Sequence, residues 1–181
     1  MRHWFRLFML AALLLAVPAV LCAQAQPAVQ EQQKPSLPNY VELSSRIGTG
    51  GQPTDAGMKQ LAEKGYKRII NLRTSGEGVD LAAEERQAMQ LGLRYYMVPF
   101  NAKEPTEEQA LAFSALMSAL KEDKVFVHCG SGNRAGSLMM IYLALEEGMP
   151  PDKAEQEARK AGLRSSDLLE FAKQVIGRHR K

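Results

Sequence analysis

Hydrophobic and polar positions repeat with two different periods along the chain from about residue 40 onward. Short apolar runs, which are typical of buried strands in a parallel sheet, occur at 67–72 (KRIINL), 93–98 (LRYYMV) and 125–128 (VFVH). Segments with helical spacing of apolar residues separate and follow these runs, at 54–64, 80–91, 107–122 and 134–147, and two more short helices are expected from Pro151 onward. Strands that alternate with helices predict an α/β fold, with a mainly parallel central sheet flanked by helices and a helical C-terminal part.

Local signals mark several of the helix ends. Thr54 is expected to cap one helix, Thr106 and Gln109 resemble a capping box, and Pro151 suits the first position of another helix. Ligands of open parallel sheets bind at the carboxyl ends of the strands. Cys129, which directly follows the third apolar run, is therefore the first candidate for chemistry.

The first 25 residues have the organisation of a secretory signal peptide. Arg2 and Arg6 precede an apolar run at 7–21, and residues 23–25 (AQA) form the small-x-small pattern of a cleavage site. The run is shorter than the roughly 20 residues that a helix needs to cross a bilayer. We expect cleavage after residue 25, an exported and periplasmic product, and no stable membrane insertion after cleavage. The alternatives are an uncleaved N-terminal anchor and lipid attachment at Cys22.

Composition divides the remaining chain into a lead-in and one domain. Residues 26–39 (QPAVQEQQKPSLPN) contain too few large apolar groups to order themselves, so we expect a disordered lead-in before a domain at 40–181. Of the 181 residues, 45% are hydrophobic and 24% are charged, as in ordinary globular proteins. The formal charge of +3 is too small to indicate a nucleic-acid partner. Two cysteines and three histidines predict neither a disulfide framework nor a metal site.

The segment 128–137 (HCGSGNRAGS) combines several features that suit the binding of an anion. Small residues at Gly130, Ser131 and Gly132 allow the backbone to curl tightly between a strand and a helix. The loop amides, through Asn133, can then converge on one point, where the helix dipole adds positive potential. Arg134 supplies a planar fork that matches two oxygens of a tetrahedral anion. The same field favours a thiolate at Cys129, so this pattern predicts an activated nucleophile beneath an oxyanion cradle.

The loop sequence VFVHCGSGNRAGS resembles the signature loop of the protein tyrosine phosphatase superfamily. Three further stretches, GGQPT at 50–54, RIINLR at 68–73 and YYMVPFNAKEPT at 95–106, are similar to the phosphatase-like domain of bacterial β-lactamase hydrolase-like proteins. The resemblance covers about residues 40–150 and implies a phosphatase-like fold.

By this resemblance, Cys129 would be the nucleophile, Arg134 the phosphate clamp and the amides of the loop the oxyanion donors. The resemblance also implies that His128 orients the loop and that Gln52 forms a pocket wall. Arg73 stands at the carboxyl end of the first apolar run and is expected at the same edge of the sheet, either as a site residue or as a surface arginine.

Three departures from the superfamily pattern bear on the activity. Four residues, and not five, separate Cys129 from Arg134, as in the sulfur-carrying loop of rhodaneses. Ala135 stands where the superfamily usually has Ser or Thr. Asn101 stands where the superfamily often has an aspartic general acid, which leaves Glu104 as the nearest substitute.

The sequence therefore predicts an exported, cysteine-dependent hydrolase that cleaves phosphate esters through a phosphocysteine intermediate and needs no cofactor. Its expected partner is a phosphorylated or other oxyanion substrate. Two alternatives remain open: a sulfurtransferase or persulfide carrier, which the short loop favours, and a module that binds oxyanions without catalysis.

Overall fold

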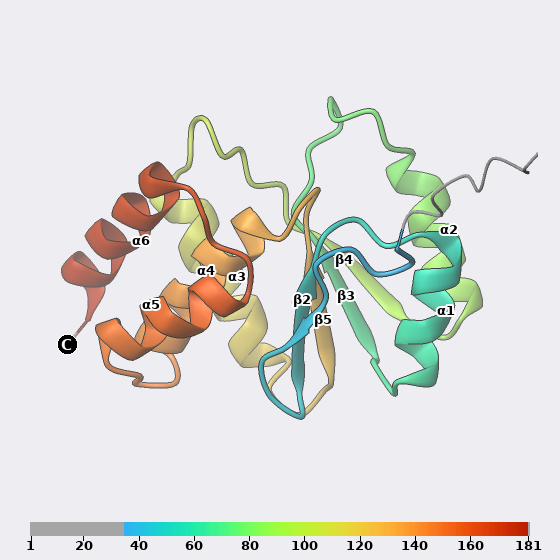
Figure 1. The fold of residues 1–181 in the computed structure, drawn as a ribbon, viewed down its shortest axis with the longest axis horizontal. Coiled ribbons are helices and arrows are strands. Elements are labelled where there is room, and N and C mark those ends of the chain that lie inside the picture. Colours follow the sequence, from blue (N-terminus) through green and yellow to red (C-terminus); the bar gives the residue numbers. More distant parts are fainter. Residues whose placement is uncertain (1–34, 181) are drawn as a thin grey trace, which may run out of the picture. The chain divides into compact units, whose positions relative to one another are not determined.

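A five-stranded sheet lies at the centre of the computed structural model, which describes residues 35–180 (Figure 1). The strands follow the order β1-β2-β5-β3-β4, and all neighbouring pairs are parallel except β1 and β2. Their bounds are Val41–Glu42 (β1), Ile47–Gly50 (β2), Arg68–Asn71 (β3), Arg94–Met97 (β4) and Val125–His128 (β5). The predicted mainly parallel sheet is confirmed. The predicted signal peptide, and residues 26–34 of the predicted lead-in, lie outside the described residues.

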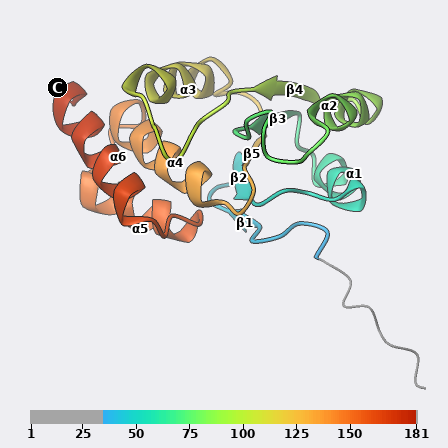
Figure 2. The ribbon, with the colours of Figure 1, turned by 90° about the horizontal axis from the view of Figure 1, so that it is seen from above.

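Helices cover both faces of the sheet (Figure 2). On one face lie α1 (Asp55–Glu63) and α2 (Leu81–Gln90). On the other face lie α3 (Glu107–Ala119), α4 (Asn133–Leu145), α5 (Pro151–Lys160) and α6 (Ser166–His179). The expected caps are present, because the Thr54 side chain accepts from the Gly57 amide and Thr106 and Gln109 form a reciprocal capping box. No helix among residues 35–180 is both long and apolar enough to span a membrane.

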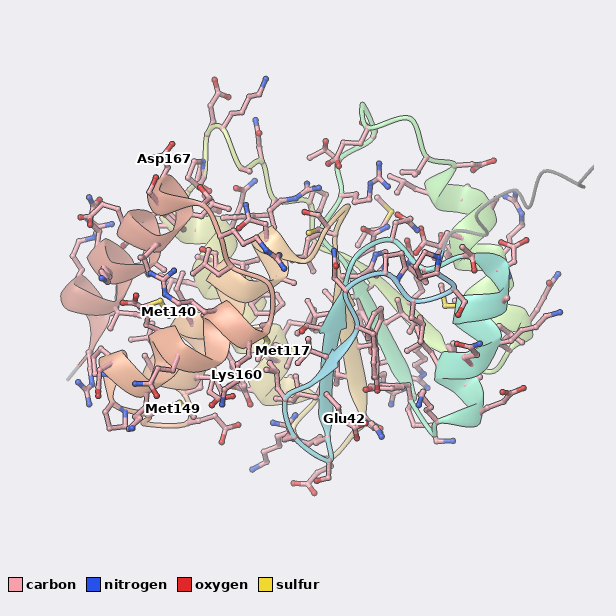
Figure 3. All side chains as sticks on the ribbon, viewed as in Figure 1. Glu42, Met117, Met140, Met149, Lys160 and Asp167 are labelled. Carbon is pink, nitrogen blue, oxygen red and sulfur yellow. The ribbon has the colours of Figure 1, made fainter. Side chains whose placement is uncertain are left out.

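Two apolar clusters, one on each face, hold the layers together. The larger cluster includes Val127 and Cys129 from the β5 end and extends through α4 to α5 and α6. The smaller cluster joins Phe126 to α1 and α2. Successive residues of a strand point to opposite faces, so β5 contributes to both clusters. Met140, from α4, lies within the helical layer and is 1% exposed (Figure 3).

Two short strands, β1 and β2, were not expected from the sequence. The β2 segment, IGTG, has no apolar strand pattern, and its glycines are more typical of a turn. Close packing explains these glycines. A Cβ on Gly48 would lie 2.1 Å from the hydroxyl of Tyr66, and a Cβ on Gly50 would lie 3.0 Å from the Phe126 ring. Glycine is thus required in β2 by neighbours that are distant in sequence.

The packed domain begins before residue 40, where the composition predicted its start. The Gly51 amide donates to the Pro38 carbonyl at 2.8 Å, and the Thr54 amide donates to the Ser36 carbonyl at 3.0 Å. A Cβ on Gly57 would lie 2.0 Å from the Ser36 carbonyl oxygen. Residues 36–39 therefore lie against the segment that joins β2 to α1. Their polar composition concealed these contacts because the backbone makes them.

Candidate active site

Cys129 lies at the carboxyl end of β5, the central strand of the sheet. Its side chain is 1% exposed, and its Sγ accepts a hydrogen bond from the Gly132 amide at 3.1 Å. The loop closes in this way because Gly132 adopts φ +93°, a left-handed conformation that side chains disfavour. A backbone N–H that points at the sulfur stabilises a negative charge there.

The backbone amides that follow Cys129 are those that the sequence predicts to form an oxyanion cradle, here called the cup. Gly132 is the N-cap of α4 but offers no side-chain cap to the helix. Within residues 35–180, the amides of Gly130, Ser131, Asn133 and Arg134 donate no hydrogen bond to a protein acceptor outside helix α4. Uncapped N–H groups at the start of a helix combine with its dipole to attract an anion. Among the described residues, the segment that follows the thiol thus has several backbone donors without a protein acceptor.

Close backbone contacts hold the loop of the cup on two sides. A Cβ on Gly136, in the first turn of α4, would lie 2.5 Å from the Leu163 amide nitrogen. On the opposite side, Gly51 forms a bridge with Ser131, and the Gln52 amide donates to the Gly130 carbonyl at 3.3 Å. These contacts fix the shape of the loop before any ligand binds.

Arg134 is held by a carboxylate that the sequence did not indicate. Its Nη1 and Nη2 donate to the two carboxylate oxygens of Glu77, each at 2.6 Å. Nη1 also donates to the carbonyls of Leu72 at 3.2 Å and Phe100 at 3.1 Å. Within the described residues, no protein oxygen accepts from the edge formed by Nε and the second Nη2 proton, and Cys129 lies near the guanidinium. That edge is a planar two-donor fork suited to a phosphate.

The charge of Arg134 is secured by its surroundings. Burial alone would lower the pKa of the guanidinium, but the hydrogen bonds with Glu77 and the nearby Cys129 raise it overall. Glu77 responds in the opposite direction: the Arg134 hydrogen bonds lower its pKa to about 2, and Thr74 contributes to this. The pair is therefore ionised over the whole physiological range.

Glu77 is itself fixed by a turn in the loop between β3 and α2. The Thr74 amide donates to the Glu77 Oε1 at 2.7 Å, and the Thr74 hydroxyl donates to the same oxygen at 3.0 Å. Arg73 Nε donates to Oε2 at 3.2 Å, and Arg73 Nη2 donates to the Glu77 carbonyl at 2.7 Å. Arg73 thus lies at the predicted edge, but it holds Glu77 and does not face the cup.

A second buried polar contact, between His128 and Glu84, lies on the opposite face of the sheet. His128 is fully buried, its Nε2 lies 2.9 Å from Glu84 Oε1, and its ring stacks on Phe126. Burial alone would raise the pKa of the Glu84 carboxyl, but His128 and then Gln52 bring it below its ordinary value. The His128 side chain therefore faces away from Cys129, since neighbouring residues of a strand point to opposite faces.

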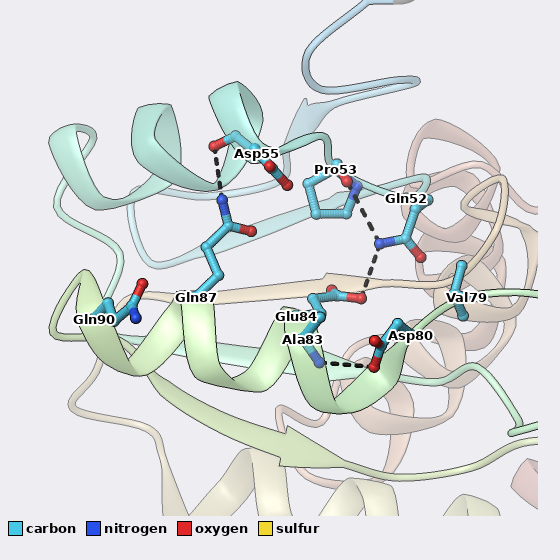
Figure 4. A pocket seen from close by; sticks show the side chains of 9 residues that line it. All are labelled: Gln52, Pro53, Asp55, Val79, Asp80, Ala83, Glu84, Gln87 and Gln90. Carbon is cyan, nitrogen blue, oxygen red and sulfur yellow. Dashed lines mark hydrogen bonds between the residues drawn. The ribbon is translucent and has the colours of Figure 1, made fainter.

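Gln52 connects Glu84 to Arg73, which in turn holds Glu77. Its Oε1 accepts from Arg73 at 2.9 Å, and its Nε2 donates to Glu84 at 2.9 Å. Gln52 and Glu84 also line a pocket of about 440 Å³ between α1 and α2 (Figure 4), together with Pro53, Asp55, Val79, Asp80, Ala83, Gln87 and Gln90. The Gln52 side chain is a wall of this pocket, and its amide group binds Glu84 and Arg73.

The remaining predicted side chains have separate places. The Asn133 Oδ1 accepts from the amides of Arg164 at 2.7 Å and Ser165 at 3.1 Å, so this side chain holds the α5–α6 loop. Asn101 and Glu104 are exposed on the loop between β4 and α3, where Asn101 accepts from the Lys103 amide. Within residues 35–180, no hydrogen bond or ion pair of the Glu104 side chain is present.

A metal centre is not built into this site. Within the described residues, no group of three or more His, Cys, Asp or Glu side chains is placed to hold a metal ion. The site is instead a thiol, a ring of backbone donors and one guanidinium edge. Such an arrangement can bind a tetrahedral oxyanion and attack its central atom.

Comparisons with known proteins agree with this geometry. A family model described as "DSP-PTPase phosphatase fused to NAD+ Kinase" matches residues 21–176. The chain is 36% identical over 120 residues to a β-lactamase hydrolase-like protein from Xylella fastidiosa, which covers 64% of the chain but only 27% of that relative. The chain thus spans about a quarter of the length of this curated relative.

Solved structures show the same fold. The structure of Tk-PTP in its active form has a TM-score of 0.67 at 19% identity, over 78% of this chain and 98% of the other. A variant of Pseudomonas aeruginosa TpbA bound to phosphotyrosine has a TM-score of 0.60 at 18% identity, over 80% of this chain and 90% of the other. At these identities the likeness concerns the arrangement of the chain, a protein tyrosine phosphatase-like fold, as the resemblance implied.

Proposed function

The chain belongs to the DSP-PTPase phosphatase family, and from that premise we propose that it is a cysteine-dependent phosphatase acting on phosphate esters. The observation that carries the proposal is a set of donors beside Cys129 that have no protein acceptor among the described residues: the amides of residues 130, 131, 133 and 134 together with the Nε edge of Arg134. These donors match the three non-bridging oxygens of a phosphate monoester. The phosphotyrosine bound to the TpbA variant is consistent with an oxyanion substrate.

In the first step, the Cys129 thiolate attacks phosphorus and forms the S–P bond. The bond from phosphorus to the ester oxygen breaks, and its electron pair leaves with that oxygen. The loop amides and Arg134 bind the equatorial oxygens, where charge accumulates in the transition state. Glu104 is the proposed donor of a proton to an alkoxide leaving group, whereas an aryloxide leaves without one.

In the second step, water attacks the phosphocysteine and the S–P bond breaks. Inorganic phosphate is released and the electron pair returns to sulfur as thiolate. The superfamily usually helps this step with a hydroxyl after the arginine, but here that position is Ala135. Ser137 cannot substitute, because its hydroxyl donates to the Leu168 carbonyl at 2.9 Å. The Gly132 amide, 3.1 Å from the sulfur, takes that role.

The four-residue spacing between Cys129 and Arg134 favours one alternative function, sulfur transfer. The thiolate would then take the outer sulfur of thiosulfate, release sulfite and hold a persulfide. Cyanide would remove that sulfur as thiocyanate and return the thiolate. The same cup would bind the sulfonate oxygens of thiosulfate, so the geometry of the cup alone suits both anions.

One experiment separates these functions. The purified protein and its Cys129→Ser variant are assayed with an aryl phosphate and, separately, with thiosulfate plus cyanide. We expect phosphate release by the unmodified protein only. Thiocyanate formation without phosphate release would establish the sulfurtransferase, and binding of phosphate without either reaction would establish a non-catalytic module.

We further propose that the protein is exported and acts in the periplasm. The support is the basic start, the short apolar run and the AQA pattern that ends at Ala25. Mass spectrometry of the periplasmic fraction should find a new N-terminus at Gln26. Recovery of the uncleaved chain from the membrane fraction would contradict this proposal.

A further inference from the structure

The loop between α5 and α6 lies directly against the cup. It runs from Ala161 to Ser165, between Lys160 at the end of α5 and Asp167 in the first turn of α6 (Figure 3). A Cβ on Gly162 would lie 3.1 Å from the carbonyl of Gly132, so the two backbones are in contact. The loop cannot move away from the cup without opening this contact.

Arg164 is the one residue of this loop whose side chain is exposed and cationic. Its backbone amide donates to the Asn133 Oδ1 at 2.7 Å, and Asn133 immediately precedes the phosphate-clamping arginine. Its guanidinium Nη1 donates to the Gly162 carbonyl at 3.0 Å. Both ends of the Arg164 residue are therefore attached to elements that touch the cup.

The guanidinium of Arg164 has no carboxylate partner among the residues that the structure describes. Within residues 35–180, no carboxylate oxygen lies within 4.0 Å of its guanidinium nitrogens. Asp167, the nearest acidic residue along the chain, accepts instead from the hydroxyl of Ser166. Arg134 and Arg73, by contrast, each have Glu77 as a partner. An exposed guanidinium without a counter-ion at the margin of an anion site is available to a ligand.

We infer that Arg164 is a specificity-determining residue that binds a second anionic group of the substrate. The inference rests on the proposed function and extends it: the preferred substrates are phosphate esters that carry a carboxylate or a further phosphate close to the ester. The first phosphate occupies the cup and its oxygens face Arg134. The second group lies outside the cup, where Arg164 can pair with either anion through two parallel N–H donors.

The test uses binding to the Cys129→Ser variant, so that no turnover is required. The probes are three capped phosphotyrosine peptides that differ only in the flanking residues, which are glutamines, glutamates or phosphoserines. We expect the glutamate and phosphoserine peptides to bind more tightly than the glutamine peptide. Adding Arg164→Gln should reduce this preference about tenfold, which corresponds to roughly 1.4 kcal/mol. The preference should also weaken with added salt, as expected for an exposed ion pair.

The matched control is Arg94→Gln in the same background. Arg94 is exposed, has no ion pair among the described residues and lies at the start of β4, at the opposite end of the strands from Cys129. It should leave the preference unchanged. Equal losses with Arg94→Gln and Arg164→Gln would overturn the inference, since they would reflect net charge alone.

The remaining outcomes separate the inference from the function on which it rests. Binding of all three peptides with equal affinity would overturn the role of Arg164 and leave the phosphatase proposal intact. Binding of none of them would overturn both, because the cup would not accept a phosphate ester. A preference for phosphoserine over glutamate would identify a second phosphate, and not a carboxylate, as the natural group.

Discussion

The loop that follows β5 and the loop that follows β3 end at the same edge of the sheet, but they use their polar groups in opposite ways. The β5 loop, residues 129–132, has backbone donors that no protein oxygen accepts among the described residues, and its Gly132 amide donates to the Cys129 sulfur. The β3 loop, residues 72–80, turns its donors onto its own carboxylate, Glu77, which then holds Arg134. One loop is arranged for an external anion, and the other already contains an internal one.

This difference shows how a single arginine can serve both loops. Glu77 and two backbone carbonyls occupy one end of the Arg134 guanidinium, and the opposite edge stays available to the ligand. The internal anion therefore need not compete with the substrate, because each anion has its own pair of donors. The arrangement also fixes the direction of the guanidinium before binding, which reduces the entropy lost when the ligand binds.

The largest expected effect is a loss of turnover on changing Glu104, in a third loop between β4 and α3. This change tests whether the third loop, like the β5 loop, acts on the ligand. Glu104→Gln should reduce turnover of an alkyl phosphate by roughly 10²–10⁴, the usual contribution of a general acid. Turnover of an aryl phosphate should hardly change, because its leaving group departs without a proton. Steady-state kinetics with both substrates measures this.

The control for the third loop is Asn101→Asp, which should add little if Glu104 supplies the proton. If Glu104→Gln is silent and Asn101→Asp creates activity on alkyl phosphates, no acid is present in the natural chain. Equal losses on both substrates would assign Glu104 to the shape of the loop and not to proton transfer.

The next largest effect is expected on changing Arg134, whose guanidinium contacts both loops. Arg134→Lys should reduce kcat/KM for an aryl phosphate by about 10²–10³, because an ammonium cannot reproduce two parallel N–H donors. It should also reduce the protection of Cys129 against alkylation by added phosphate or vanadate. An unchanged protection would mean that the amides alone bind the anion, which would contradict the division of donors described above.

The free energy of unfolding should distinguish a glycine that is packed beside the cup from one that is exposed on a helix. Gly136→Ala should lower the free energy of unfolding by about 1–3 kcal/mol, the usual cost of overpacking, since its Cβ would lie 2.6 Å from the Ala158 carbonyl oxygen. Gly177→Ala is the matched control in α6, because nothing lies within 4 Å of its Cβ position. That change should stabilise the protein slightly through helix propensity. Chemical denaturation measures both.

The smallest expected effect on kcat/KM comes from changing Glu77, the carboxylate that holds Arg134. Glu77→Gln should reduce kcat/KM about tenfold, roughly 1.4 kcal/mol in the transition state, because an amide can accept only one of the two hydrogen bonds from Arg134. Glu77→Asp, which keeps the charge on a shorter side chain, should recover part of the loss. A rise in kcat/KM on Glu77→Gln would instead identify Glu77 as a competitor of the substrate.

The same variant has a pH signature. The pKa of Glu77 in the folded protein is about 2, below its ordinary value of 4.5. The stability that its ionised form contributes is fully present above pH 4.5 and is lost as the pH falls toward 2. The free energy of unfolding of Glu77→Gln should therefore depend less on pH in this window than that of the unmodified protein.

Much of the fold was predictable because its signals are local. The strands β3, β4 and β5 are short apolar runs, and the caps of α1 and α3 are recognisable within four residues. The exception, β2, lacks such a signal because its glycines are dictated by Tyr66 and Phe126 across the sheet. A composition that reflects distant neighbours cannot be interpreted from the segment alone.

The candidate site was predictable to a similar extent. The HCGSGNR segment contains the thiol, the flexible loop and the arginine within seven residues, so the cup could be inferred from sequence. Glu77 could not, because it is separated from Arg134 by more than fifty residues and a lone glutamate in a polar loop has no distinguishing pattern. The same holds for Glu84 of α2, which comes close to His128 only when the helix packs on the sheet.

The sequence by itself therefore determined the order of most elements and the place of a cysteine that is followed by a glycine-rich loop and an arginine. The tertiary structure decided which donors remain available to a ligand. Arg134, Arg73 and Arg164 are the same residue type, and although the spacing from Cys129 marks Arg134, the sequence does not show which donors of each arginine have protein partners. Only the folded chain shows that Glu77 accepts from the Nη1 and Nη2 donors of Arg134 and pairs with Arg73. Arg164 has no carboxylate partner among the described residues, and its Nη1 donates to a backbone carbonyl. The physical reason is that hydrogen-bonding capacity is finite, and its allocation depends on contacts between segments that meet only on folding.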